Sequence, residues 1–326
     1  MKFQQQLLKF NYTTIVLIQI VCTLLWFLPF FFDKVPDNSV SISFLGKEII
    51  EYKPLTATLI QYFFISIFGY IINFTLEKLK LIPLHNHFFY ISFLFLCSVT
   101  SYAQLFNTTA ISFFLLLIAL HNLMKMFQSE AVFRAFNCML FLSVATLFNI
   151  EYLWFIPFFW IAFIQLKAFT RNTFFASIFG LATSTVALVL TAYITDTLPI
   201  VENYFSMIKI VYFDLENISI KSIDIIGYFI FIVFLFYYIF VCFVHRYEQS
   251  KNIYIYTFLS TIFVIFIIIF YIINSHLYRE ICLLLLLLTS VFSTFYYNFK
   301  QTKSSNIILL IFIGLGIFYR IIFLLT

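Results

Sequence analysis

Four histidines are the side chains of this sequence best suited to hold a metal ion. Imidazole binds both non-haem iron and zinc, and each of these residues lies near the end of an apolar stretch: His85, His87, His121 and His245. His85 and His87 are two residues apart, so on a helix their side chains would diverge by about 200°. They converge only where the chain is extended, which Pro83 permits. The alternative interpretation is that all four are polar residues at helix ends.

Two aspartates, Asp33 and Asp37, directly follow the first apolar stretch. Membrane glycosyltransferases that take sugars from polyprenyl phosphates place acidic residues in this position, where a carboxylate binds a metal and acts as a base. These two residues are therefore candidates for catalysis. The alternative is that both are solvated acids of a loop.

Two further ionisable residues fall at the depth of the apolar stretches. Glu151 lies at the break between two short stretches, and short interrupted helices beside a polar residue are typical of transporter sites. Its alternative role is that of a turn residue at the outer interface. Arg320 lies six residues before the end of the chain, so its flexible stem is expected to carry the guanidinium to the outer interface. A buried ion pair is the alternative.

Familiar catalytic and cofactor motifs are missing from the sequence. G-x-G-x-x-G, P-loop, H-E-x-x-H and G-x-S-x-G patterns do not occur, so nucleotide binding and standard hydrolase chemistry have no support, and no cofactor-binding residue is predicted. No two cysteines form a C-x-x-C pair, and all of them fall in apolar stretches, where Cys behaves as a small hydrophobe: Cys22, Cys97, Cys138, Cys242 and Cys282.

The composition indicates which environment surrounds these residues. The 326 residues are 63% hydrophobic and only 10% charged, whereas a soluble domain carries roughly 25% charged residues. A chain so poor in charge cannot cover a water-facing surface, so its outer surface must face lipid. The net charge of +5 comes from basic residues scattered along loops, which excludes a nucleic-acid partner and leaves the bilayer as the expected one.

Apolar runs of about 20 residues predict membrane-spanning helices rather than the ten-residue alternation of a transmembrane barrel. The expected fold is an all-α polytopic bundle of ten or eleven spans, forming one membrane domain over 1–326. The run 135–166 is too long for one helix and is either two short spans or a re-entrant hairpin. The spans are expected at 13–32, 55–76, 87–103, 108–127, 135–150, 152–166, 173–194, 224–244, 253–274, 280–297 and 306–325.

The charges of the loops predict the orientation. With the N-terminus inside, twelve Lys and Arg residues fall in inner loops and six in outer loops, which is the bias of the positive-inside rule. The C-terminus is then outside, and the expected location is a bacterial cytoplasmic membrane. Two outer segments are long enough to hold structure: 33–54, with the alternation of a hairpin or interfacial strand, and 195–223, where Pro199 suits the first turn of an amphipathic interfacial helix.

A third of the chain, from about 84 to 185, resembles an uncharacterised bacterial family of polytopic inner-membrane proteins. The resemblance lies in an aromatic helix, a short basic loop at Lys167 and Arg171, and a glycine in the next helix, within Phe-Phe-Trp-Ile-Ala-Phe-Ile-Gln-Leu-Lys-Ala-Phe-Thr-Arg-Asn-Thr-Phe-Phe-Ala-Ser-Ile-Phe-Gly at 158–180. In that family a proline tends to follow this glycine, whereas Leu181 follows it here. Some members are labelled carotene 15,15'-monooxygenase, which implies a histidine-dependent iron site.

Three functions of different classes follow as hypotheses. The first is a non-catalytic envelope component or transporter-like protein, and a transporter would have a cavity at mid-membrane near Glu151. The second is a membrane-embedded, histidine-dependent carotene-type oxygenase, which alone requires iron. The third is a glycosyltransferase that uses polyprenyl-phosphate sugars and depends on Asp33 or Asp37. The sequence does not decide whether the protein is an enzyme.

Overall fold

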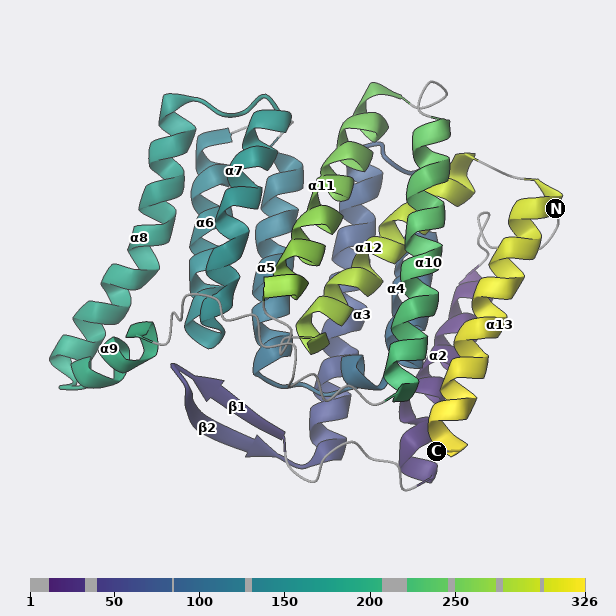
Figure 1. Ribbon diagram of the computed structural model, residues 1–326, viewed down its shortest axis with the longest axis horizontal. Helices are drawn as coiled ribbons and strands as arrows, with labels where there is room; N and C mark the ends of the chain where they lie inside the picture. The colour runs from purple at the N-terminus through teal and green to yellow at the C-terminus, as the bar shows by residue number, and fades with distance from the viewer. Residues whose placement is uncertain are drawn as a thin grey trace.

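The computed structural model is an all-α bundle with one small hairpin, which confirms the predicted fold class (Figure 1). The structure describes residues 12–32, 40–83, 85–126, 131–206, 222–245, 250–273, 278–299 and 302–325. The helices of the first half are α2 (Tyr12–Phe31), α3 (Pro54–Lys78), α4 (Phe88–Val99), α5 (Thr108–Lys125), α6 (Ala131–Phe148) and α7 (Ile156–Gln165). Those of the second half are α8 (Arg171–Ile194), α9 (Leu198–Ser206), α10 (Ser222–Val244), α11 (Lys251–Ile273), α12 (Tyr278–Phe299) and α13 (Lys303–Leu325).

The apolar helices coincide with the predicted spans and make this a multi-pass membrane protein. Among the described residues, 7 helices are long and apolar enough to cross a membrane: α3, α5, α6, α8, α11, α12 and α13. Shorter apolar stretches lie in α2, α4, α7 and α10. Each predicted span therefore falls on an apolar helix, because about 20 consecutive apolar residues without interior breaks can satisfy their backbone groups in lipid only as a helix.

The ambiguous run 135–166 makes two passes through the bundle. Asn149 ends α6, and its side chain accepts a hydrogen bond from the backbone N–H of Glu151 at 3.2 Å, which starts the 3₁₀ helix η2 (Ile150–Phe155). Pro157 then falls in the first turn of α7, where proline is well tolerated. In Figure 1, α6 and the η2–α7 segment lie side by side and run in opposite directions between the two ends of the bundle. Ala131–Phe148 is long and apolar enough to cross a membrane, whereas Ile150–Gln165 is a shorter apolar stretch, so the choice between two spans and a re-entrant hairpin stays a prediction.

A hairpin and a short helix cover one end of the bundle. Strands β1 (Val40–Phe44) and β2 (Lys47–Tyr52) pair antiparallel through a two-residue turn. Both turn residues, Leu45 and Gly46, have positive φ, as a tight hairpin turn requires. The Leu45 N–H donates to the Leu147 carbonyl at 3.1 Å, which ties the turn to the end of α6. The predicted hairpin is confirmed.

The predicted helix after Thr197 is also present, as α9. Tyr204 is buried, and its hydroxyl donates a hydrogen bond of 2.6 Å to the carbonyl of Thr146, so α9 is attached to the same end of α6 as the hairpin. The structure describes the predicted segment only as far as Ser206, and its remaining part falls in 207–221, outside the described residues. Its placement at the surface of the membrane stays a prediction.

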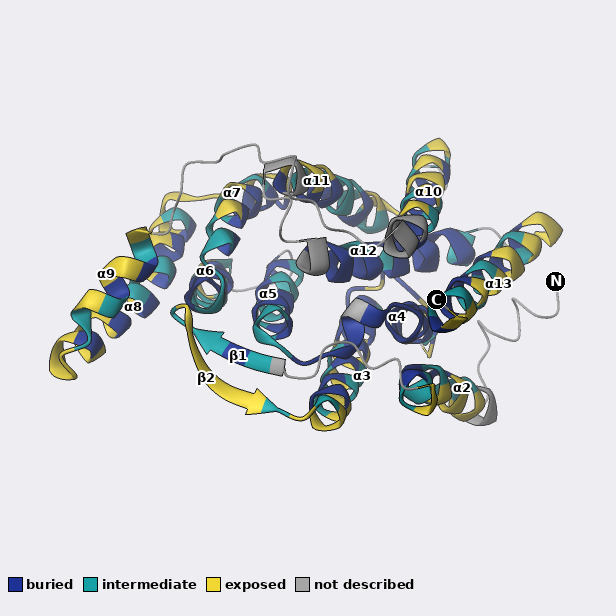
Figure 2. Ribbon diagram, turned by 60° about the horizontal axis from the view of Figure 1, so that its bottom comes forward, coloured by how far each residue is buried: buried dark blue, intermediate teal, exposed yellow. Residues whose placement is uncertain are grey.

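Helices α4 and α12 form the centre of the bundle. Every residue of α4 is buried, and α12 is almost wholly buried, including its polar residues Thr289, Ser290 and Ser293. Figure 2 shows these two helices in the middle, whereas α2, α8 and α13 lie at the edge and expose one apolar face. The buried Ser and Thr hydroxyls of α12 donate to carbonyls of their own helix, as Ser290 does to Leu286 at 2.8 Å, so these polar groups are satisfied inside the protein.

The two ends of the bundle differ in charge as the orientation predicts. Lys78 and Lys125 close α3 and α5, and Arg171 opens α8, at the end opposite the hairpin (Figure 1). The hairpin end carries Glu48 and Glu51, both exposed. By the positive-inside rule the first end is expected in the cytoplasm and the hairpin outside, and this orientation stays a prediction.

Labelling of single cysteines tests this orientation. The five native cysteines are buried, whereas Glu48 in β2 and Ser304 in the first turn of α13 are exposed. We expect a membrane-impermeant maleimide added to intact cells to label Glu48→Cys, and to label Ser304→Cys only after the cells are broken. The native protein, unlabelled in both conditions, is the control. The reverse pattern would show that the bundle is inverted.

Candidate functional site

The four candidate histidines come from different parts of the bundle. His85 lies in the loop before α4 with φ of 61°, and His87 precedes α4, its ring stacked on Tyr70 with 6.4 Å between the ring centroids. His121 lies in α5, and its Nδ1 is 2.9 Å from the hydroxyl oxygen of Thr75 in α3. His245 follows the end of α10.

No three of these imidazoles form a centre in the part of the chain that the structure describes. Within those residues, no group of three or more His, Cys, Asp or Glu side chains is placed to hold a metal ion. The iron site therefore stays a prediction from sequence, without support from the geometry, and so does the oxygenase activity that depends on it.

The structure describes one of the three candidate carboxylates. Asp33 and Asp37 fall in 33–39, outside the described residues, so the glycosyltransferase hypothesis stays a prediction. Glu151 lies in the first turn of η2 and is half-buried. It does not line any of the three cavities described below, and the transporter cavity expected beside it is not among them.

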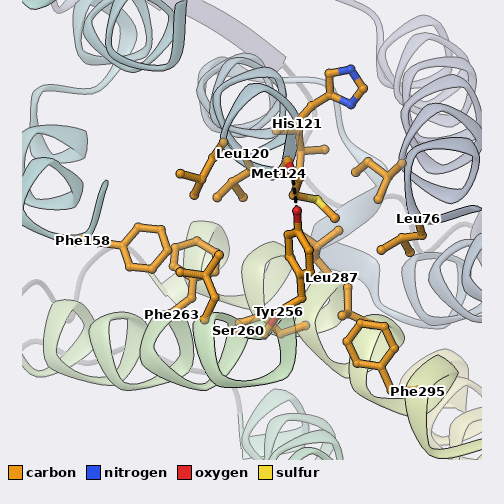
Figure 3. A pocket seen from close by; sticks show the side chains of 16 residues that line it. Leu76, Leu120, His121, Met124, Phe158, Tyr256, Ser260, Phe263, Leu287 and Phe295 are labelled. Atoms are coloured by element: carbon orange, nitrogen blue, oxygen red, sulfur yellow. Dashed lines mark hydrogen bonds between the residues drawn. The ribbon is translucent and has the colours of Figure 1, made fainter. Parts of the chain in front are cut away.

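The first cavity lies between α3, α5, α7, α11 and α12 and has a volume of about 70 Å³. Apolar side chains such as Leu76, Phe158 and Phe263 surround it, and Figure 3 shows the imidazole of His121 turned away from its centre. The Tyr256 hydroxyl reaches across and donates to the carbonyl of Met124 at 2.6 Å. That carbonyl lies in the last turn of α5, where helices leave carbonyls without an internal donor, so Tyr256 completes the helix end and is not available to a ligand there.

The second cavity lies under the hairpin, between β1, β2, α8 and α9, and has a volume of about 290 Å³. Its lining mixes apolar residues with Lys47, Thr191 and Thr195. The hydroxyl of Thr191 donates to the carbonyls of Ala187 and Leu188 in its own helix. This cavity therefore lies between the bundle and the hairpin with α9 that covers its end, at the predicted outer surface.

The third cavity is a groove between two helices at the edge of the bundle and one at its centre. It has a volume of about 210 Å³, and α4 forms its floor while α2 and α13 form its walls. Phe95 and Ile91 lie on the floor, Val21 on the α2 wall, and Ile313 and Ile317 on the α13 wall. The only hydroxyl of the lining, that of Ser92, donates to the carbonyl of Phe89 at 3.0 Å. The lining of the groove is thus apolar.

A buried arginine stands beside this groove. Arg320 in α13 has 0% of its surface exposed, and its Nη2 donates a hydrogen bond of 3.1 Å to the carbonyl of Leu25 in α2. The expectation that the stem of Arg320 carries an exposed guanidinium along lipid to the outer interface is wrong, because the side chain is fully buried. The guanidinium turns toward α2 and is covered by protein instead of extending along lipid.

Pro29 explains why the Leu25 carbonyl is available to Arg320. In a regular helix the N–H of residue 29 would donate to the carbonyl of residue 25, but proline has no N–H. Pro29 lies inside α2, so the carbonyl of Leu25 lacks its helical donor and accepts from Arg320 instead. The arginine therefore connects α13 to α2 at a carbonyl that the proline has freed.

Sequence reasoning singled out Arg320 but missed its partner. Pro29 and Arg320 are both conspicuous, as a proline within an apolar run and a charge within an apolar run. Residues 25 and 320 are 295 positions apart, and only the packing of α2 and α13 against α4 brings them together.

Comparison of the chain with protein-family models, with curated proteins and with solved structures found no match.

Proposed function

We propose that this protein is a transporter-like, non-catalytic component of a bacterial cytoplasmic membrane that binds the apolar chain of a membrane lipid in the groove between α2, α4 and α13. The observation that supports this most is the lining of the groove, which is apolar over about 210 Å³ and closed on its inner side by the buried helix α4. Such a lining suits a hydrocarbon chain, because ligand sites are mostly apolar with few polar groups that fix orientation.

A binding role fits this lining better than a catalytic role. Acid–base and nucleophilic chemistry need titratable groups beside the substrate, and the groove presents hydrocarbon, aromatic rings, the Ser92 hydroxyl and the thiol of Cys22. The walls belong to edge helices whose outer faces carry exposed apolar residues, among them Leu17 and Leu310. A lipid can therefore enter sideways from the bilayer without crossing a polar surface.

We also propose that the chain belongs with the bacterial family that 158–180 resembles. In support, the glycine of that segment, Gly180, lies where α8 meets α6 with backbone contact: a Cβ added there would be 2.4 Å from the carbonyl oxygen of Phe136. A residue type that the packing of two helices requires is one that related chains would share.

Photocrosslinking tests the lipid groove. The protein is reconstituted in nanodiscs that contain phosphatidylcholine with a diazirine near the middle of one chain, and the labelled peptides are mapped. We expect labelling to concentrate on groove residues of α2, α4 and α13. Val21→Trp, which fills the groove from its α2 wall, should lower that labelling at least fivefold.

The matched control is Ile20→Trp. Ile20 is as exposed as Val21, at 51% against 50%, and does not line the groove. Its labelling should equal that of the native protein. Labelling spread evenly over all lipid-facing helices, or reduced equally by both variants, would contradict the proposal.

A further inference from the structure

Arg320 lies beyond one end of the groove lining, one turn further along α13. The α13 wall contributes Ile313 and Ile317, and Arg320 lies on the same face one turn further along the helix. The α2 wall contributes Cys22, and Leu25 lies one turn further along that helix. Because the guanidinium of Arg320 donates to the carbonyl of Leu25, it links the two wall helices one turn beyond the residues that line the groove. Figure 2 shows α2 and α13 on either side of α4 at this edge of the bundle.

The hydrogen bonding of this guanidinium is incomplete. Nε and Nη1 are buried and have no hydrogen-bond partner among the described residues. The contact with the ring of Phe323, with 5.7 Å between the guanidinium carbon and the ring centroid, supplies no acceptor in the plane of the donors. A buried charged donor without an acceptor is costly, and the planar fork of a guanidinium matches the oxygens of phosphate or carboxylate.

We propose that Arg320 binds the phosphate of an anionic phospholipid whose hydrocarbon chain occupies the groove. This inference rests on the proposed lipid-binding function and adds the class of the headgroup. Arginine within a membrane segment marks a functional site when a partner is available to it, and the bond to Leu25 uses one N–H of the guanidinium, which leaves Nε and Nη1 for the phosphate oxygens.

The depth of the residues favours a lipid over a free anion. Arg320 lies five residues before Leu325, the last residue of α13, and five residues of helix correspond to about 8 Å. Leu25 lies six residues before Phe31 at the end of α2, which corresponds to about 9 Å. The guanidinium is therefore close to the level of headgroups in the predicted outer leaflet, and the groove extends from it toward the middle of the membrane. A phospholipid of that leaflet likewise has its charge at the headgroup level and its hydrocarbon chains directed toward the middle of the membrane.

The experiment compares two headgroups on the same chain. Diazirine-labelled phosphatidylglycerol and phosphatidylcholine, equally diluted in nanodiscs, are crosslinked to the native protein and to two variants. We expect the native groove to take phosphatidylglycerol about tenfold better, as one strong charge-assisted contact provides. Arg320→Met should abolish the preference while phosphatidylcholine still labels the groove, and Arg320→Lys should retain part of it.

The outcomes separate this inference from the proposed function. Groove labelling without any headgroup preference, or a preference that survives in Arg320→Met, would overturn the role of Arg320 and leave lipid binding intact. Absence of groove labelling by both lipids would overturn the proposed function. Loss of the preference on adding inorganic phosphate would identify a free anion as the ligand. A preference that appears only in an Asp33→Asn, Asp37→Asn double variant would show that a carboxylate of the chain itself pairs with the guanidinium in the native protein. That result would equally overturn the inference.

Discussion

Replacing Gly180 by alanine should lower the free energy of unfolding by about 1–3 kcal/mol, the range for overpacking a close-packed interior. The added Cβ would lie 2.4 Å from the carbonyl oxygen of Phe136 and 3.1 Å from the backbone nitrogen of Leu140. Backbone atoms cannot turn aside as a side chain can, so α8 must move away from α6. That movement also separates Ser143 from Ser184, whose hydroxyls share a hydrogen bond between the two helices. The free energy is measured by denaturant titration in mixed micelles.

Gly314 in α13 provides the matched control. A Cβ at Gly314 meets nothing within 4 Å, so Gly314→Ala should stabilise the protein by up to about 1 kcal/mol through helix propensity alone. The two substitutions are chemically identical and should act with opposite sign. Equal effects would show that α6 and α8 do not approach each other closely at Gly180.

Truncating Leu286 to alanine should cost about 2–5 kcal/mol of unfolding free energy. Leu286 is 0% exposed at the centre of α12, and the neighbouring helices cannot collapse into the space that its side chain leaves. The same substitution at Leu310 in α13 should cost roughly 0.5 kcal/mol or less, because that residue is 53% exposed and lipid chains fill the gap. Unfolding of both variants in the same micelles measures the difference.

A similar loss in both variants would mean that α12 is not the central helix. This pair therefore tests the arrangement of the bundle directly, since leucines in an apolar helix differ in their stability effect only through what surrounds them. In a membrane, lipid chains are as apolar as leucine, and helix association depends on close packing.

The contrast between Leu286 and Leu310 also shows where sequence reasoning reaches its limit. Apolar run length predicts each helix, because only a helix satisfies its own backbone hydrogen bonds in lipid. It does not predict which helix becomes the centre, because a protein interior and a bilayer select the same residue types. Helix α12 carries more polar residues than α13, yet α12 is inside and α13 at the edge.

Among the candidate features, those that depend on local sequence were predictable and those that depend on helix packing were not. The hairpin at 40–52 and the start of α9 were predictable because alternation, turn residues and Pro199 act locally. The histidines suggested a metal centre because each lies near the end of an apolar stretch, but that position does not determine the direction in which a side chain points around the axis of its helix. His121 contacts Thr75, and His87 stacks on Tyr70. These contacts depend on how the helices are rotated against one another, which a single sequence does not reveal.

The sequence by itself determined that the chain is a polytopic helical membrane protein, and its loop charges predict which end faces the cytoplasm. Both properties follow from the free energy of transferring individual segments between water and lipid. That free energy is a sum over the residues of each segment. The tertiary structure alone decided that Arg320 is buried and that it donates to the carbonyl freed by Pro29. That contact joins residues from opposite ends of the chain, and its free energy exists only after α2 and α13 have packed on α4.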